Sequence, residues 1–326
     1  MPSGADGSIV YATCTEGGYE VLRNLLRKDA RVSEIVSLTP EQGDRYGVSG
    51  YQSAKPLAER HNVPLYYVEQ YDLETDRDRG HFQETDGDLL IVNGWQRLVP
   101  EDILRMFDRG ALGVHGSADG LPKGRGRSPM NWSILEGMDR FLLSVIQLEE
   151  GTDEGAIVDT RKYEVTEFDT IRTLYYKLAM ATTEILLESL EPILDGTFEY
   201  EPQEGTPTYY PKRKPDDGAI HWRNPTGKIH DLVRAVAEPY PGAFTEVDGA
   251  RVHVWDAVPF STDFGRDGRA GEILQVFETT EEFVVRTGDG TLLVREWEAD
   301  EWEPHEGTVL ESLGEPDRAD EVIASE

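Results

Sequence analysis

Short apolar runs alternate with helical patterns through the first half of this 326-residue chain. Runs of four to nine residues bounded by turn residues are typical of buried strands rather than helices. They lie at 8–13, 32–40, 64–69, 88–95 and 110–115. Because strands that alternate with helices favour a parallel sheet covered on both faces, the sequence predicts an α/β domain with a Rossmann-like, mainly parallel sheet.

A polar stretch rich in proline and glycine, residues 195–218, interrupts this pattern. The runs beyond it have strand character, and Asp248-Gly249 between two of them is a strong hairpin signal. We therefore expect the second half to form a small antiparallel β-barrel of the OB-like kind. The predicted boundaries are a catalytic domain at 1–196, a linker at 197–215, an OB-like barrel at 216–313 and an acidic tail at 314–326.

The charge is the strongest signal in the composition, because 63 Asp and Glu stand against 32 Lys and Arg, a formal net charge of −31. Salt at molar concentration screens such self-repulsion, so we interpret the surface as halophilic; a dedicated basic partner is the alternative. Generic nucleic-acid binding is disfavoured, since phosphate contacts need clustered positive charge. The single cysteine, the lack of a long apolar stretch and the polar first residues favour a cytoplasmic protein with no membrane partner.

The stretch GVHGSADGLPKGRGRSPMNW at 113–132 carries the most chemistry. His115 ends a predicted strand, a Gly/Arg loop follows it, and Asp153 lies in the loop after the next predicted strand, 141–148. Ligands of open α/β sheets bind beyond the carboxyl ends of the strands, and in a parallel or mixed sheet we expect these two loops to face each other across that crevice. A His–Asp pair there stabilises an oxyanion and removes a proton from an amine. The structural alternatives are a solvated aspartate and a histidine satisfied by backbone groups.

The joint pattern resembles the folate-dependent formyltransferases, which act on methionyl-tRNA, glycinamide ribonucleotide or nucleotide sugars. The family signature runs Asn-x-His, Ser, Pro-x-x-Arg-Gly-x-x-Pro and Asp-x-Gly-x-Asp-x-Gly. The matching residues are His115, Ser117, Pro122-x-x-Arg125-Gly126-x-x-Pro129 and Asp153 in LEEGTDEG. NGWQRLVP at 93–100 resembles the folate-facing segment, and KPDDGAIHW and VRAVAEPYPGAF resemble the C-terminal domain of the tRNA and aminosugar members.

The resemblance implies 10-formyltetrahydrofolate as co-substrate and no metal. It implies that His115 binds the oxyanion, while Asp153 holds the histidine and moves the amine proton through water. The segment 94–99 would hold the pterin ring, and the predicted cofactor-binding residues are Gly94, Trp95, Arg97, Leu98 and Val99. The loop facing the acceptor would include Ser117, Arg125 and Gly126, although a purely structural turn is an equal alternative for the last two.

Two departures from the family pattern affect the expected site. Gly113 replaces the asparagine of Asn-x-His, whose amide donates to the formyl oxygen, and one such donor contributes about 100- to 1,000-fold in rate. We name Asn93 as the candidate replacement donor and include it among the predicted catalytic residues. The loop between His115 and Pro122 is also two residues longer than usual, which alters the expected acceptor contacts.

Three functions follow from the resemblance. The first is formyl transfer to a primary amine, with a nucleotide-linked amino sugar ahead of methionyl-tRNA, because the surface is acidic and PKRK at 211–214 is the only compact basic cluster. The second is a silent protein that binds folate or a nucleotide sugar. The third is formyl-tetrahydrofolate hydrolysis, which is disfavoured because those enzymes usually carry a further N-terminal domain. The sequence does not predict the acceptor, the oligomeric state or the one-carbon carrier itself.

Overall fold

The computed structural model describes residues 7–265 and 267–314, which form two compact units. The first unit comprises residues 7–126, 141–164 and 175–208, and the second contains the remaining described residues. The predicted linker at 197–215 is therefore divided, since its residues up to 208 group with the first unit. Of the predicted acidic tail, all but Gly314 lies outside the described residues.

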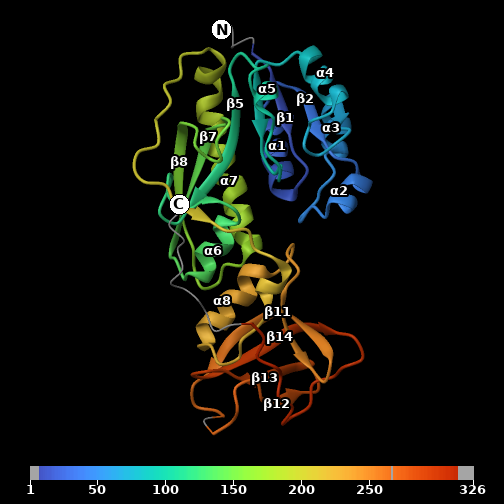
Figure 1. Cartoon of the computed structure of the whole chain (residues 1–326), viewed down its shortest axis with the longest axis vertical. Helices are drawn as coiled ribbons and strands as arrows, with labels where there is room; N and C mark the ends of the chain where they lie inside the picture. The colour runs from blue at the N-terminus through green and yellow to red at the C-terminus, as the bar shows by residue number, and fades with distance from the viewer. Residues whose placement is uncertain (1–6, 266, 315–326) are drawn as a thin grey trace. The chain divides into compact units, whose positions relative to one another are not determined.

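A seven-stranded sheet forms the centre of the first unit, in the order β3-β2-β1-β4-β5-β7-β8 (Figure 1). The first five strands of this order are parallel, and β7 pairs with β5 antiparallel. This arrangement confirms the predicted mainly parallel sheet. The strands are β1 (Ile9–Ala12), β2 (Val32–Ser37), β3 (Leu65–Tyr67), β4 (Leu89–Val92), β5 (Ala111–Ser117), β7 (Arg140–Gln147) and β8 (Ile157–Glu164).

Helices cover this sheet on both faces, and alternate strand residues enter two separate cores. Ile9 and Tyr11 of β1 pack in a core with α1, α3 and α7. Val10 and Ala12 pack in a second core with α4 and α5. Strands β1 and β4 are buried on both faces, which explains their continuous apolar sequences. The helices are α1 (Glu16–Arg27), α2 (Pro40–Tyr46), α3 (Lys55–His61), α4 (Asp76–Glu84), α5 (Glu101–Leu104) and α7 (Ile171–Leu194).

Three of these elements carry too little apolar pattern for the sequence to predict them: α2, α4 and β8. Helix α2 begins with a capping box, in which the Thr39 and Gln42 side chains satisfy each other's backbone N–H groups. Helix α4 buries only Phe82 and Asp78. Polar local contacts rather than an apolar stripe therefore determine both helices.

Asp78 is a buried carboxylate that organises the turn between β3 and α4. Its side chain is 0% exposed. Its Oδ1 accepts hydrogen bonds from the Tyr66 hydroxyl and the Glu69 amide, both at 2.8 Å. Its Oδ2 accepts from the Gln70 amide at 3.1 Å and from the Thr75 hydroxyl at 2.9 Å. One side chain thus satisfies four donors.

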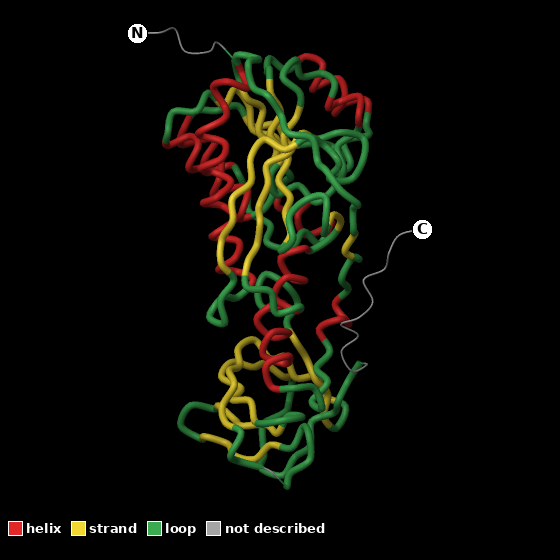
Figure 2. The backbone as a smooth tube through the Cα atoms, turned by 90° about the vertical axis from the view of Figure 1, so that its left-hand side faces the viewer, coloured by secondary structure: helices red, strands yellow, loops and turns green. Residues whose placement is uncertain are grey.

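The second unit contains a five-stranded antiparallel sheet in the order β10-β11-β14-β13-β12, which confirms the predicted antiparallel domain. Figure 2 shows that this unit consists mainly of strands and loops. Asp248 and Gly249 form the β10–β11 turn, both with positive φ, as the hairpin signal predicts. The strands are β10 (Ala243–Val247), β11 (Ala250–Ser261), β12 (Ile273–Phe277), β13 (Glu282–Arg286) and β14 (Thr291–Ala299).

Two helices and a 3₁₀ turn accompany this sheet. They are α6 (Pro129–Leu135), α8 (Thr226–Val236) and η1 (Pro215–Gly218). The short strand β9 (Tyr209–Tyr210) also belongs to the second unit, whereas the short strand β6 (Arg125–Gly126) belongs to the first. Ser128 stands at the N-cap of α6 with a left-handed φ, but its side chain makes no capping hydrogen bond. Trp222 is fully buried and donates its indole N–H to the Thr245 hydroxyl, which anchors the core of the unit. None of the helices in the described residues is both long and apolar enough to span a bilayer.

Candidate active site

His115 lies in β5 with only 8% of its side chain exposed. Its Nδ1 is 3.3 Å from Asp153 Oδ2, and its Nε2 is 3.0 Å from the backbone oxygen of Gly124. Both partners are acceptors, so each ring nitrogen of His115 faces an oxygen.

Asp153 reaches His115 across an antiparallel strand pair. Strand β7 is antiparallel to β5, so the loop 148–156 leaves at the amino end of β5 and folds back toward His115. The expected His–Asp contact is present in this mixed sheet, and the Gly126 amide joins the two loops through Asp153. Asp153 has a φ of 56°, an uncommon conformation for a residue other than glycine.

The Gly/Arg loop after β5 also contacts the His–Asp pair. The Gly126 amide donates to Asp153 Oδ2 at 3.0 Å, so one carboxylate oxygen contacts both the loop and His115. Ser117 donates its hydroxyl to the backbone oxygen of Lys123 at 2.6 Å, within the same loop. The structure thus brings Gly126 to the His–Asp pair, whereas the Ser117 side chain is engaged in the structure of the loop.

Arg125 is buried beside the pair and holds a residue that the sequence analysis missed. Its Nε and Nη2 donate to Gln203 Oε1 at 3.2 and 2.8 Å, and its Nη1 donates to Glu154 Oε1 at 3.2 Å. Gln203 lies in the predicted linker, where a single glutamine among exposed polar residues gives no sequence signal. The segment that the sequence predicts as linker therefore contributes a side chain to the surroundings of the site.

Leucine fills the space beside Gly113. A Cβ placed on Gly113 would stand 2.5 Å from Leu148 Cδ2, well inside van der Waals contact. Leu148 packs partly buried against the second core of the first unit. An asparagine at this position therefore cannot be accommodated unless the leucine side chain moves.

Asn93 does not lie beside His115. Its side chain is next to the Tyr11 hydroxyl, and Tyr11 belongs to the core formed with α1, α3 and α7. Val114 packs against that same core, so its neighbour His115 faces the opposite side of the sheet. This placement gives no support to the prediction that Asn93 replaces the missing donor.

The predicted folate-facing segment lies on the same sheet face as His115. Trp95 is 9% exposed and belongs to the second core, and its Nε1 has no hydrogen-bond partner among the described residues. The Arg97 guanidinium stacks over the Tyr71 ring at 4.9 Å, and Val99 is half-buried. Leu98 is 70% exposed, which leaves an apolar side chain available for contact. The positive φ of Gly94 allows the turn that begins the segment.

Cys14 lies beneath this segment, fully buried, with its Sγ 3.3 Å from the Tyr71 hydroxyl. Burial raises the pKa of the thiol from 9 to about 11, against smaller opposing effects of Tyr71 and Arg97. Between these values the unfolded thiol ionises while the folded thiol stays protonated, so stability falls as pH rises through this window. The free energy of unfolding should drop by about 1.4 kcal/mol for each pKa unit of the shift.

We expect urea denaturation at pH 8 and pH 10.5 to show this loss in the native protein and a smaller loss in Cys14→Ala. Burial also raises the pKa of Tyr71, so part of the alkaline loss remains in the variant. An identical pH dependence for the two proteins would contradict the assignment of the effect to the thiol.

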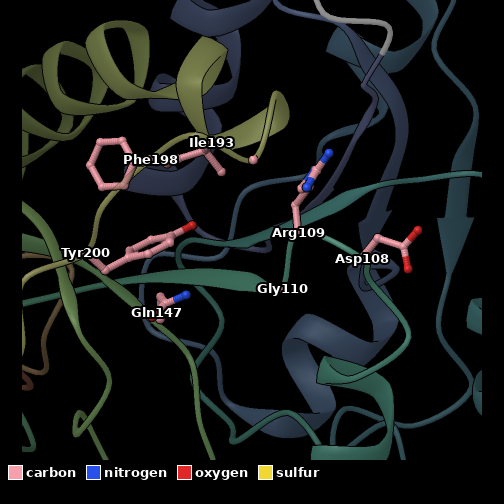
Figure 3. A pocket seen from close by; sticks show the side chains of 8 residues that line it. Asp108, Arg109, Gly110, Gln147, Ile193, Phe198 and Tyr200 are labelled. Carbon is pink, nitrogen blue, oxygen red and sulfur yellow. The ribbon is translucent and has the colours of Figure 1, made fainter.

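A separate pocket of about 280 Å³ lies in the first unit, away from His115 (Figure 3). Tyr200 and Gln147 enter it from one side, and Arg109 and Asp108 from the other. Burial raises the pKa of Tyr200. The next residue, Glu201, exchanges two backbone hydrogen bonds with Ile157, of 2.7 and 2.9 Å. The chain that leads to Gln203 is thus fastened to β8.

Several solved structures share this fold. HypX from Aquifex aeolicus, solved with tetrahydrofolic acid, is 19% identical over 93% of this chain at a TM-score of 0.64, and this chain covers 45% of HypX. An N-formyltransferase from Helicobacter canadensis, solved with folinic acid and dTDP-3-aminofucose, is 15% identical over 89% of this chain and 99% of its own, with a TM-score of 0.62. Methionyl-tRNA formyltransferase from Clostridium thermocellum is 17% identical over 91% of this chain and 100% of its own, with a TM-score of 0.58.

Two family models match the sequence itself. Residues 14–190 match the model described as formyl transferase, and residues 212–308 match the one described as formyl transferase, C-terminal domain. The first match contains His115, the Gly/Arg loop and Asp153, as the motif resemblance predicts. Since this match alone covers more than half of the chain, the protein belongs to the formyl transferase family of enzymes.

Proposed function

We propose that this enzyme transfers a formyl group from 10-formyltetrahydrofolate to a primary amine, with a nucleotide-linked amino sugar as acceptor. The observation that carries the proposal is the contact between His115 Nδ1 and Asp153 Oδ2, in a chain that matches the formyl transferase model. The solved relatives bound to tetrahydrofolic acid and folinic acid support a folate carrier.

The roles of the chain's own groups follow from this geometry. The co-substrate would supply a formyl carbon that the amine attacks, so the formyl oxygen gains negative charge. The bond from that carbon to the folate nitrogen then breaks, and tetrahydrofolate leaves with the proton that the amine loses. His115, held between Asp153 and the Gly124 carbonyl, donates an N–H toward that oxygen, for which Nε2 must leave its contact with Gly124. Asp153 keeps the ring oriented and takes up the amine proton through water. The exposed Leu98 and the unpartnered indole N–H of Trp95 fit a ring bound along 94–99.

Two observations favour an amino sugar as the acceptor: the net charge of this protein and the ligand of one solved relative. A net charge of −31 opposes the approach of tRNA, whose phosphates bind clustered positive charge. The relative from Helicobacter canadensis was solved with a nucleotide amino sugar, which supports a small acceptor. Methionyl-tRNA is the alternative acceptor, supported by the relative from Clostridium thermocellum. We also propose a cytoplasmic, salt-adapted protein from the composition.

Turnover in molar KCl tests the function. The protein is supplied with 10-formyltetrahydrofolate and, in separate reactions, with no acceptor, methionyl-tRNA or a panel of nucleotide amino sugars. We expect tetrahydrofolate release only with an amino sugar. Release with methionyl-tRNA alone would support the alternative acceptor, and release without acceptor would indicate hydrolysis. Folate binding without release in any reaction would support the silent binding protein, which the loss of the family asparagine at Gly113 favours.

Restoring the family asparagine brings a new side chain against Leu148 in this chain. Gly113→Asn alone should give a smaller gain than the same substitution beside alanine at 148, because Leu148 Cδ2 lies 2.5 Å from the added Cβ and must turn aside. The double variant Gly113→Asn/Leu148→Ala should raise kcat by about 100-fold over Leu148→Ala, the lower end of what one oxyanion donor contributes. Steady-state kinetics of the three variants measure this. Equal kcat values for the double variant and Leu148→Ala would mean that another group already supplies the donor.

A further inference from the structure

We propose that Gln203 is a positioning residue that holds the Asp153 loop in register with His115, an inference that rests on the proposed function. Its side chain makes four hydrogen bonds. Oε1 accepts from Nε and Nη2 of Arg125 at 3.2 and 2.8 Å. Nε2 donates to the backbone oxygens of Asp153 and Gly155, both at 2.8 Å.

Chemistry fixes which way this amide points. A guanidinium has only donors, so the group that faces Arg125 must be the amide oxygen. A backbone carbonyl oxygen can only accept a hydrogen bond, so the group that faces the carbonyls of Asp153 and Gly155 must be the amide nitrogen. The two ends of the side chain are therefore not interchangeable, and glutamine is the residue of this size that serves both partners.

The loop needs such support because its conformation is costly. Asp153 adopts a positive φ, which costs free energy in a residue other than glycine, although less in aspartate than in most. Glu154, the next residue, is held by Arg125, which Gln203 in turn contacts. Gln203 thus binds the loop directly through two carbonyls and indirectly through one guanidinium, and its own backbone segment is fastened to β8 by Glu201.

Two variants test the side chain, one isosteric and one truncated. Gln203→Glu keeps the acceptor for Arg125 but turns a carboxylate oxygen toward the carbonyls of Asp153 and Gly155, where it has no proton to donate. Gln203→Ala removes all four bonds. The neighbouring Glu204 is exposed, and Glu204→Gln serves as the matched control on the same segment.

Both Gln203 variants should lower kcat by about 10- to 100-fold, since a displacement of about 1 Å in a catalytic group costs about 10²-fold. KM for the formyl donor should stay within about threefold, because the 94–99 segment is unchanged. Hydrogen–deuterium exchange of peptides covering 148–156 should become faster in both variants and remain native in Glu204→Gln. This exchange measurement does not depend on activity.

A double-mutant cycle with Asp153→Asn decides between positioning and general stabilisation. If Gln203 acts through Asp153, adding Gln203→Ala to Asp153→Asn should reduce kcat by less than about twofold further. Fully multiplicative losses, or native exchange in 148–156, would overturn the inference. If Asp153→Asn itself leaves turnover unchanged while exchange in 148–156 rises in Gln203→Ala, the catalytic role of Asp153 and the positioning role of Gln203 both fail, whereas absence of turnover in the native protein with every acceptor would contradict the proposed function instead.

Discussion

Replacing His115 by alanine should reduce kcat for formyl transfer by about 10²- to 10⁴-fold, the range that a positioned acid–base group contributes. The ring is buried between two acceptors, Asp153 Oδ2 and the Gly124 oxygen, and alanine leaves no donor for the formyl oxygen. KM for 10-formyltetrahydrofolate should change little, because the ring is proposed to act on charge that develops during the reaction. Steady-state kinetics in molar KCl measure both values.

The control for this variant is His305→Ala, which removes an exposed histidine of the second unit. It should retain native kcat and native thermal stability. Unchanged turnover in His115→Ala would show that the assigned site is wrong, whatever the acceptor. A folded His115→Ala protein is confirmed by a native circular dichroism spectrum at the assay temperature.

Replacing Asp78 by alanine should lower the free energy of unfolding by about 3 to 5 kcal/mol, the largest stability effect expected here. Four donors in the β3–α4 turn lose their acceptor, and hydrogen bonds to charged groups contribute about 1.5 to 3 kcal/mol each but do not add fully. Asp78→Asn keeps one acceptor oxygen and should lose roughly half as much. Urea denaturation in molar KCl measures the series.

Asp76→Asn is the matched control for the Asp78 series, because Asp76 is exposed at the start of the same helix. It should change the free energy of unfolding by about 0.5 kcal/mol or less, as surface substitutions generally do. A loss in Asp78→Ala no larger than in Asp76→Asn would mean that water replaces the carboxylate in the turn.

Strong apolar periodicity made much of the fold predictable. The buried strand at 89–92, the helix at 171–194 and the Asp248-Gly249 hairpin all follow from local pattern. Helix α4 does not, because its position depends on the buried carboxylate of Asp78 rather than on an apolar face. Patterns of hydrophobicity cannot report contacts of that kind.

The sequence predicted which residues form the His–Asp pair, but not how the strands and loops bring them together. His115 and Asp153 follow from motif resemblance, and the structure brings them to 3.3 Å. The antiparallel direction of β7, which decides how Asp153 arrives, is a property of strand pairing that no local stretch contains. Gln203 and Leu148 were missed for the same reason, since each acts on a residue far away in the chain or across a strand pair.

The packing of Leu148 against Gly113 couples the two positions energetically. A side chain at position 113 needs space that the end of the Leu148 side chain now occupies. Substitutions at the two positions should therefore not act independently, and the effect of any residue placed at 113 should depend on the residue at 148.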